Sequence, residues 1–209
     1  MGSQWSHSPR SQRIELIHHI DPTGETTVSR ITIPTVEQAP DASKPLLAAV
    51  KQQLGVVPNL MKVVGNSPAA LEGYLALNGA LAKGKIDVKL RERIALAVAE
   101  YNGCYNCLLA HDYLGRNIAK LGQDELDAAR DGRSSDPRAD SALRFARRVA
   151  ESRGRVSDAD LAAVRLAGFD EAGVIEIVVN VALNVLTNYV NNVAATDIDF
   201  PKVHAKLAA

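Results

Sequence analysis

Both cysteines of this 209-residue chain lie within four positions of each other, as Cys104 and Cys107. No disulfide can therefore join distant segments, and a fold stapled by disulfides is excluded by the count. The hydrophobic core has to hold the fold, and 46% hydrophobic residues at this length suit one globular domain better than two. The chain has 31 alanines and only 4% aromatic residues, a composition that favours closely packed helices.

The charge balance argues against two classes of partner. Lys plus Arg and Asp plus Glu both total 24, so the net charge is zero. A neutral chain lacks the basic excess typical of proteins that bind nucleic acids or anionic membranes. The sequence has no run of 18 apolar residues, and residues 1–10 lack the apolar stretch of a signal peptide. We therefore expect a cytoplasmic protein with no nucleic-acid or membrane partner.

Capping signals divide the chain after Pro45 into helices. Ser67-Pro68, Asp87, Ser157 and Asp170 each mark a helix start, and Gly122 marks an end. A first helix is expected around Leu46 to Val50, and others over about 58–64, 68–81, 88–101, 104–121, 124–129, 139–152, 158–168 and 171–195. The predicted organisation is a flexible tail over 1–26, a single helical domain over 27–200 that starts with an extended segment, and a C-terminal tail over 201–209.

Within the predicted helix 104–121, both cysteines share a face with a histidine. Spacings of three and four place on this face Cys104, Cys107, His111, Leu114, Ile118 and Leu121. The same face packs into the core, so the sulfurs are expected to be partly buried at the edge of the core. Helical residues three apart have Cα atoms about 5 Å apart, which is within disulfide range.

This arrangement predicts a redox-active dithiol. Asn102-Gly103 interrupts the helical pattern, which puts the cysteines at a helix N-terminus, where free N–H groups and the helix dipole stabilise a thiolate. His111 lies one turn beyond Cys107 and can accept its proton directly or through a water molecule. A disulfide across so short a loop is also easily reduced, as a catalytic cycle requires.

Other interpretations of these residues stay open. Two cysteines in a helix can be ordinary core residues. A structural zinc site needs four ligands, but two thiolates and one imidazole make three and the chain has no second CxxC, so we expect neither metal nor cofactor. A carboxylate for a proton relay could come from Glu92, which is either a surface residue between two arginines or buried on an apolar side, or from Glu100.

Together, Glu92, Cys104, Cys107 and His111 form the pattern E-x11-C-x2-C-x3-H. This pattern resembles the signature of the AhpD-like alkylhydroperoxidases of the carboxymuconolactone decarboxylase-like superfamily. The resemblance is specific over about residues 88–122 and looser over 45–200. It implies an all-α, AhpD-like helical domain that assembles as a homotrimer or homohexamer, with a hydroperoxide as substrate.

The resemblance also implies roles for the four residues. Cys107 would be the peroxidatic cysteine and Cys104 the resolving one, with Glu92 and His111 as the proton relay. The reductant would be a dithiol, which is a protein-bound dihydrolipoamide in the best-understood members. The decarboxylase branch lacks the CxxC, so lactone chemistry is disfavoured. One position departs from the pattern: Asn106 stands where the best-known members have a histidine, and an amide cannot shuttle a proton.

The sequence therefore predicts an oxidoreductase, a thiol-dependent peroxidase with a dithiol/disulfide cycle. Two alternatives remain. The chain could be a disulfide reductase that serves a partner peroxiredoxin, or a non-catalytic helical oligomer that uses the dithiol as a redox sensor. An enzyme needs reversible cycling coupled to peroxide turnover, whereas a sensor needs only a change of assembly or binding on oxidation.

The last predicted helix also bears on assembly. It is apolar on most sides over residues 174–190, so a second copy of the chain is expected to cover it. It also carries asparagines four residues apart, which predict a solvated face, a subunit interface or a wall of the redox pocket: Asn180, Asn184, Asn188 and Asn192. A further cluster is expected to be a solvated surface: Arg144, Arg147, Arg148, Arg153 and Arg155.

Overall fold

The computed structural model describes residues 29–200, which form helices and connecting segments with no strand. A 3-10 turn η1 (Asp41–Ser43) precedes the helices. These are α1 (Lys44–Leu54), α2 (Asn59–Val64), α3 (Pro68–Leu81), α4 (Val88–Tyr101), α5 (Tyr105–Asn117), α6 (Gln123–Arg130), α7 (Pro137–Ser152), α8 (Asp158–Leu166) and α9 (Glu171–Ala194). The all-helical prediction is confirmed for this range, whereas the predicted tails over 1–26 and 201–209 lie outside it.

Most predicted helix starts are confirmed by their caps. The side chains of Ser67, Asp87 and Asp170 each accept a backbone N–H from the first turn of α3, α4 and α9, and Ser157 forms a capping box in α8. The helix predicted from residue 139 starts at Pro137, because Asp136 caps it. Capping involves residues within one turn, so the sequence determines it locally.

The helix predicted over 104–121 is shorter than expected. Cys104 is its N-cap, and α5 ends at Asn117. Ile118 is 61% exposed and does not belong to the buried face. The chain then turns through Lys120, which has a φ of +57°, and Leu121 enters the core from this loop. The predicted face is therefore correct as far as Leu114 and wrong beyond it.

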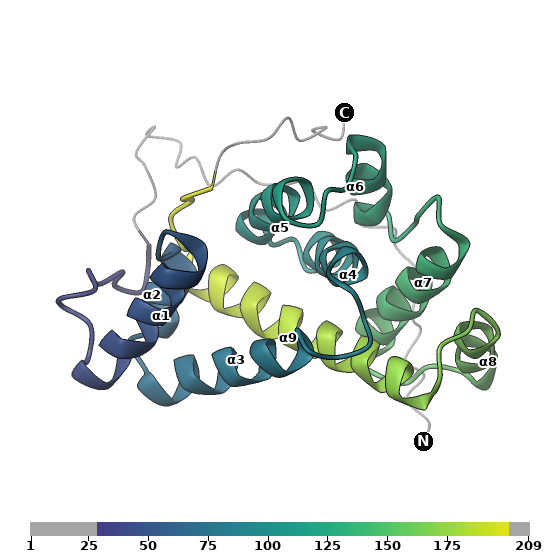
Figure 1. Ribbon diagram of the computed structural model, residues 1–209, viewed down its shortest axis with the longest axis horizontal. Coiled ribbons are helices and arrows are strands. Elements are labelled where there is room, and N and C mark those ends of the chain that lie inside the picture. The colour runs from purple at the N-terminus through teal and green to yellow at the C-terminus, as the bar shows by residue number, and fades with distance from the viewer. Residues whose placement is uncertain (1–28, 201–209) are drawn as a thin grey trace, which may run out of the picture.

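Helices α1–α3 and α4–α8 lie on different parts of the long helix α9 (Figure 1), and each group surrounds a hydrophobic core that includes residues of α9 or packs against them. The larger core lies among α4–α9, with α4 in contact with α5, α6, α7 and α9. The smaller core lies among α1–α3. The long helix α9 crosses both, because Ile177 and Val181 are buried in the larger core and Val190 packs against the smaller one. The dithiol helix α5 lies beside this junction and also contacts α9.

Among the described residues, α9 is the one helix long and apolar enough to cross a membrane by length and composition alone. Its most apolar 18-residue window has a mean hydropathy of 1.5, and half of that window is buried. Asparagines interrupt this helix, which is why the sequence shows no unbroken apolar run. Its position between the two cores accounts for the apolar side chains on its inner face.

A glycine sets the position of α5. A Cβ at Gly115 would lie 2.7 Å from Leu126 Cδ2 of α6 and 3.9 Å from Glu92 Cβ of α4. The absence of a side chain therefore lets α5 approach Leu126 of α6 closely, whereas a Cβ would lie at an ordinary contact distance from α4.

Candidate active site

The turn between α4 and α5 presents the dithiol. Gly103 has a φ of +62°, and its N–H donates to the carbonyl of Glu100, while the N–H of Cys104 donates to the carbonyl of Ala99 at 2.9 Å. These two bonds are the Schellman motif that closes α4. Cys104 is at the same time the N-cap of α5, so the chain reverses over two residues. Both cysteines therefore lie at the start of a helix, as predicted.

Cys104 and Cys107 form a disulfide, with Cα atoms 5.3 Å apart. The prediction of a pair that can close within one helical turn is confirmed. The predicted exposure is wrong, because the two residues are only 0% and 2% exposed and belong to the larger core. The reason is that α9 covers the start of α5, a contact that the pattern of α5 itself does not contain.

Glu92 and His111 meet between α4 and α5. The Oε2 atom of Glu92 lies 2.8 Å from Nδ1 of His111, and the two side chains are 15% and 22% exposed. The arginines that flank Glu92 bind elsewhere: Arg91 donates to the Asn78 side chain, and Arg93 pairs with Glu125. The carboxylate of Glu92 is thus left to the imidazole, and its interpretation as a surface residue between two arginines is wrong.

Glu100, the rival carboxylate, has a different partner. Its Oε2 atom lies 2.7 Å from Nε of Arg130 on α6. Being closer to Cys104 in the sequence did not bring it to the histidine. Of the two candidate carboxylates, the structure therefore joins Glu92 to His111 and Glu100 to a permanently charged guanidinium.

A tyrosine that the sequence analysis did not single out lies near this pair. Burial, together with the negative charge of Glu92, raises the pKa of Tyr74 to about 12. Tyr74 comes from α3 and packs against the smaller core. Its hydroxyl therefore stays protonated at neutral pH and remains a hydrogen-bond donor. No motif marks this residue, because α3 and α4 meet only through the tertiary fold.

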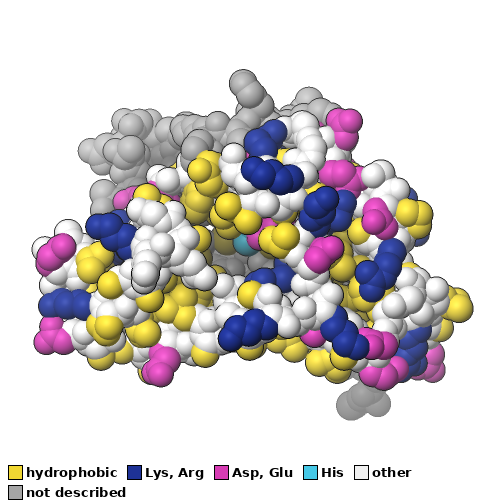
Figure 2. Space-filling model, in the orientation of Figure 1, with side chains coloured by type: hydrophobic (Ala, Val, Ile, Leu, Met, Phe, Trp, Pro, Cys, Tyr) yellow, Lys and Arg dark blue, Asp and Glu magenta, His cyan; other side chains and the backbone are white. Residues whose placement is uncertain are grey.

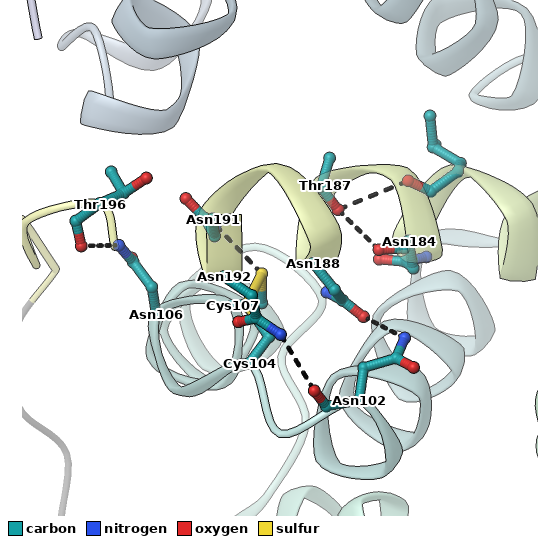
Figure 3. Close-up of a disulfide and its surroundings, with 11 residues drawn as sticks. Asn102, Cys104, Asn106, Cys107, Asn184, Thr187, Asn188, Asn191, Asn192 and Thr196 are labelled. Atoms are coloured by element: carbon teal, nitrogen blue, oxygen red, sulfur yellow. Dashed lines mark hydrogen bonds between the residues drawn. A yellow bond between two sulfur atoms is a disulfide. The ribbon is translucent and has the colours of Figure 1, made fainter. Parts of the chain in front are cut away.

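Amide side chains hold the dithiol turn against α9 (Figure 3). Asn191 Nδ2 donates to Cys107 Sγ at 3.1 Å. Asn188 Oδ1 accepts from the side chain of Asn102 at 2.8 Å, and Asn192 Nδ2 donates to the Asn102 carbonyl at 3.1 Å. Asn106, the residue that departs from the family pattern, donates to the carbonyl of Thr196 just beyond α9. Asn106 thus ties α5 to the end of α9.

The asparagine stripe of α9 is mostly internal. Asn180, Asn184 and Asn188 are 2%, 6% and 0% exposed, so the interpretation as a solvated face is wrong for these three, while Asn192 is exposed. Asn180 and Asn184 donate to carbonyls one turn earlier in their own helix. Asn188 and Asn192 reach the dithiol turn, as a wall of the redox pocket would require. The residue that contacts sulfur, Asn191, lies outside the predicted stripe.

The surface view gives the surroundings of this region. Figure 2 shows that the molecule is hollowed near the centre of the face drawn, with hydrophobic side chains around the hollow and a histidine visible at its floor.

In residues 29–200, no group of three or more His, Cys, Asp or Glu side chains is arranged to hold a metal ion. In the arginine cluster, Arg144, Arg147 and Arg148 form partly exposed ion pairs, as expected of a solvated face.

Part of this chain is similar in sequence to a known protein family and to one relative. Residues 68–152, from α3 to the end of α7, match the model of the carboxymuconolactone decarboxylase family. A protein of Haemophilus influenzae, described only as uncharacterized, is 49% identical over 45 residues. That alignment spans 21% of this chain and 40% of the relative's length.

Solved structures match over most of the chain. A peroxidase-related protein from Ralstonia eutropha JMP134, described as an alkylhydroperoxidase AhpD core, is 25% identical with a TM-score of 0.75, covering 84% of this chain and 94% of its own. A peroxidase-related protein from Silicibacter sp. TM1040 is 22% identical with a TM-score of 0.73, covering 83% and 93%. The debrominase Bmp8, crystallised with 2,3,4-tribromopyrrole, is 20% identical with a TM-score of 0.70, covering 84% and 94%. Residues 68–152 are therefore similar to the carboxymuconolactone decarboxylase family, and the helical fold of the chain is similar to that of the AhpD core structure.

Proposed function

We propose that this protein is a thiol-dependent peroxidase that reduces organic hydroperoxides. The observation that carries the proposal is the disulfide-forming pair Cys104–Cys107 at the start of α5, with His111 one turn further along the same helix and paired with Glu92 of α4. A nucleophile needs a base within reach, and the base needs an orienting group. His111 and Glu92 supply these two parts, and the apolar surroundings of the hollow in Figure 2 suit an alkyl substituent on the peroxide.

The proposed cycle begins at Cys107. Its proton passes to His111, and the thiolate attacks the terminal oxygen of the hydroperoxide, so that an S–O bond forms as the O–O bond breaks. The alkoxide leaves as the alcohol after taking a proton from the Glu92–His111 pair. Cys104 then attacks the sulfenic sulfur of Cys107, which releases water and forms the disulfide. An external dithiol returns two electrons and two protons, and protein-bound dihydrolipoamide is the proposed donor.

A peroxide-consumption assay tests this function. The reduced protein is mixed with an alkyl hydroperoxide and with dihydrolipoamide, thioredoxin or glutathione as rival donors. Sustained consumption with one donor supports the peroxidase, whereas rapid disulfide reduction without peroxide turnover favours the reductase for a partner peroxiredoxin. Cycling with neither activity favours the redox sensor. Because a debrominase shares the fold, 2,3,4-tribromopyrrole is included as a rival electron acceptor.

We also propose that copies of this chain associate through the outer face of α9. Apolar side chains lie on this face at spacings of four and three, as in helices that pair along a seam: Ile175, Val179, Ala182, Leu186, Tyr189 and Val193. Ile175, Tyr189 and Val193 are 61%, 57% and 63% exposed. A continuous apolar face on this scale is typical of an interface between subunits.

Light scattering at micromolar concentration tests the assembly. The wild-type protein is expected at a multiple of its 22.4 kDa chain mass. The double variant Leu186→Glu and Tyr189→Glu should fall to the mass of the single chain, because two carboxylates on each seam repel each other. Leu166→Glu is the matched control, since Leu166 is 89% exposed on α8 and lies off the seam. A wild-type mass near 22.4 kDa would contradict the proposal.

A further inference from the structure

The two sulfurs of the dithiol have unequal surroundings. Cys107 Sγ accepts a hydrogen bond from Asn191 Nδ2 at 3.1 Å, and the partner residue is only 5% exposed. Cys104 is fully buried in the larger core. The donor comes from α9, far from the cysteine motif in the sequence. Neither the spacing of the cysteines nor the position of His111 requires this contact.

The hydrogen bond suits the reduced state better than the disulfide. A disulfide sulfur is a weak acceptor, whereas a thiolate carries a full charge and accepts a strong, charge-assisted bond. The oxygen of the same amide, Asn191 Oδ1, is buried and has no hydrogen-bond partner among the described residues. The Asn191 side chain therefore directs its N–H donor to a weak sulfur acceptor, while its own acceptor oxygen, Oδ1, has no partner among the described residues. This orientation gains most when Cys107 carries negative charge.

The charged groups around the turn do not supply the same asymmetry. From Ile177 to its end at Ala194, α9 carries no charged residue, so it offers the sulfur amide dipoles only. Of the titratable side chains of α4 and α5, His111 pairs with Glu92, Asp112 with Arg116 and Glu100 with Arg130. The start of α5 favours negative charge on either cysteine through its dipole. Besides the position of His111 one turn beyond Cys107, the Asn191 contact separates the two sulfurs.

We propose that Asn191 is a positioning residue that holds the Cys107 thiolate by a hydrogen bond and so makes Cys107, rather than Cys104, the attacking sulfur. This inference rests on the proposed dithiol cycle, but it does not depend on the identity of the oxidant. Asn188 and Asn192, which bind Asn102, hold the same turn in place while Asn191 contacts the sulfur itself. The inner face of α9 thereby becomes part of the redox site.

The test is a thiol titration in single-cysteine proteins. The rate of alkylation by iodoacetamide is measured against pH in Cys104→Ser, where Cys107 is the only thiol, with and without Asn191→Leu. Loss of a hydrogen bond to a charged group should raise the pKa of Cys107 by about one unit, a tenfold loss of thiolate. In the Cys107→Ser protein, the same Asn191→Leu change should leave the pKa of Cys104 unchanged. The matched control is Asn184→Leu, a buried asparagine of α9 that donates only to its own helix.

A second variant and a second measurement keep the proposal falsifiable. Asn191→Ala removes the donor with less steric demand if Asn191→Leu does not fold, as judged by circular dichroism. In the two-cysteine protein, loss of the donor should also shift the equilibrium with glutathione toward the disulfide, by up to about tenfold or 30 mV. Equal shifts at both cysteines, no shift beyond that of Asn184→Leu, or a lowered pKa of Cys107 would overturn the proposal. None of these readouts uses peroxide, so they fail separately from the peroxidase assignment.

Discussion

Two glutamates of α4 form ion pairs of nearly the same length but of different chemistry. Glu92 lies 2.8 Å from His111, and Glu100 lies 2.7 Å from Arg130. An imidazole gains and loses its proton near neutral pH, whereas a guanidinium stays charged throughout. The first pair can therefore pass a proton, and the second can only hold two helices together. The length of an ion pair therefore does not distinguish these two; the chemistry of the partner side chain does.

The positions of the two pairs reinforce this difference. His111 shares α5 with both cysteines, one turn beyond Cys107, whereas Arg130 ends α6. A third pair of α4, between Arg93 and Glu125, also fastens α6. One side of α4 thus binds the helix that carries the dithiol, and the other sides bind α6. Loss of the first pair should affect chemistry, and loss of the other two should affect stability.

The largest effect is expected at the two sulfurs of the dithiol. Cys107→Ser should abolish peroxide turnover, because the thiol one turn from His111 has the nearer base. Cys104→Ser should leave one sulfenic acid per chain on Cys107, because no resolving thiol remains. Mass spectrometry of each variant after one equivalent of peroxide locates the oxidation. Sulfenic acid on Cys104 in the Cys107→Ser protein, with turnover retained, would reverse the two roles.

The next effect compares the two glutamates directly. Glu92→Gln should lower the turnover number by about 10²–10⁴, the usual contribution of a positioned acid–base group. Glu100→Gln makes the same replacement on the same helix. It should alter the turnover number by only a few-fold, while lowering the melting temperature slightly. Steady-state peroxide consumption by both variants gives the ratio. Equal, small losses would remove the distinction between the two ion pairs and leave Glu92 without a role in proton transfer.

The parts of the molecule that the sequence predicted depend on neighbouring residues. Helix starts at Ser67, Asp87 and Asp170 follow from side chains that cap their own first turn. The pairing of Cys104 with Cys107 likewise needs only one turn of chain. The Glu92–His111 pair joins two helices, and it was anticipated through the family resemblance rather than from local spacing.

The parts that the sequence did not predict depend on packing between distant segments. Asn191 reaches Cys107 across 84 positions, and nothing in the spacing of either residue indicates that contact. The full burial of the cysteines has the same origin, because α9 covers α5. The exposure of Ile118 was missed because a helical pattern continues in the sequence after the chain has left the helix at Asn117. The pattern shows which residues could share a face, and the tertiary fold decides where that face ends.

The smallest effect concerns the Arg93–Glu125 pair and appears as a pH dependence of stability. Burial acts to raise the pKa of Glu125, but hydrogen bonds from Ser135, Ser134 and Arg93 outweigh it and lower the pKa to about 2. A carboxyl group whose pKa is lower when folded stabilises the fold above its unfolded value of 4.5, and this contribution is lost as the pH falls from about 4.5 to about 2. The difference of roughly 2.5 between these two pKa values corresponds to about 3 kcal/mol of unfolding free energy, and solvent screening at this partly exposed pair reduces the expected contribution to about 2–3 kcal/mol.

Urea unfolding of Glu125→Gln at several pH values measures this contribution. At neutral pH the variant should be less stable than the wild type by about 2–3 kcal/mol, because Gln cannot supply the charge that Arg93 faces. The difference should shrink as the pH falls toward 2, where the wild-type carboxyl group is protonated as well. Asp124→Asn, an exposed neighbour on α6, is the control and should cost less than about 1 kcal/mol. A difference that stays constant with pH would mean that shape rather than charge at position 125 fastens α6 to α4.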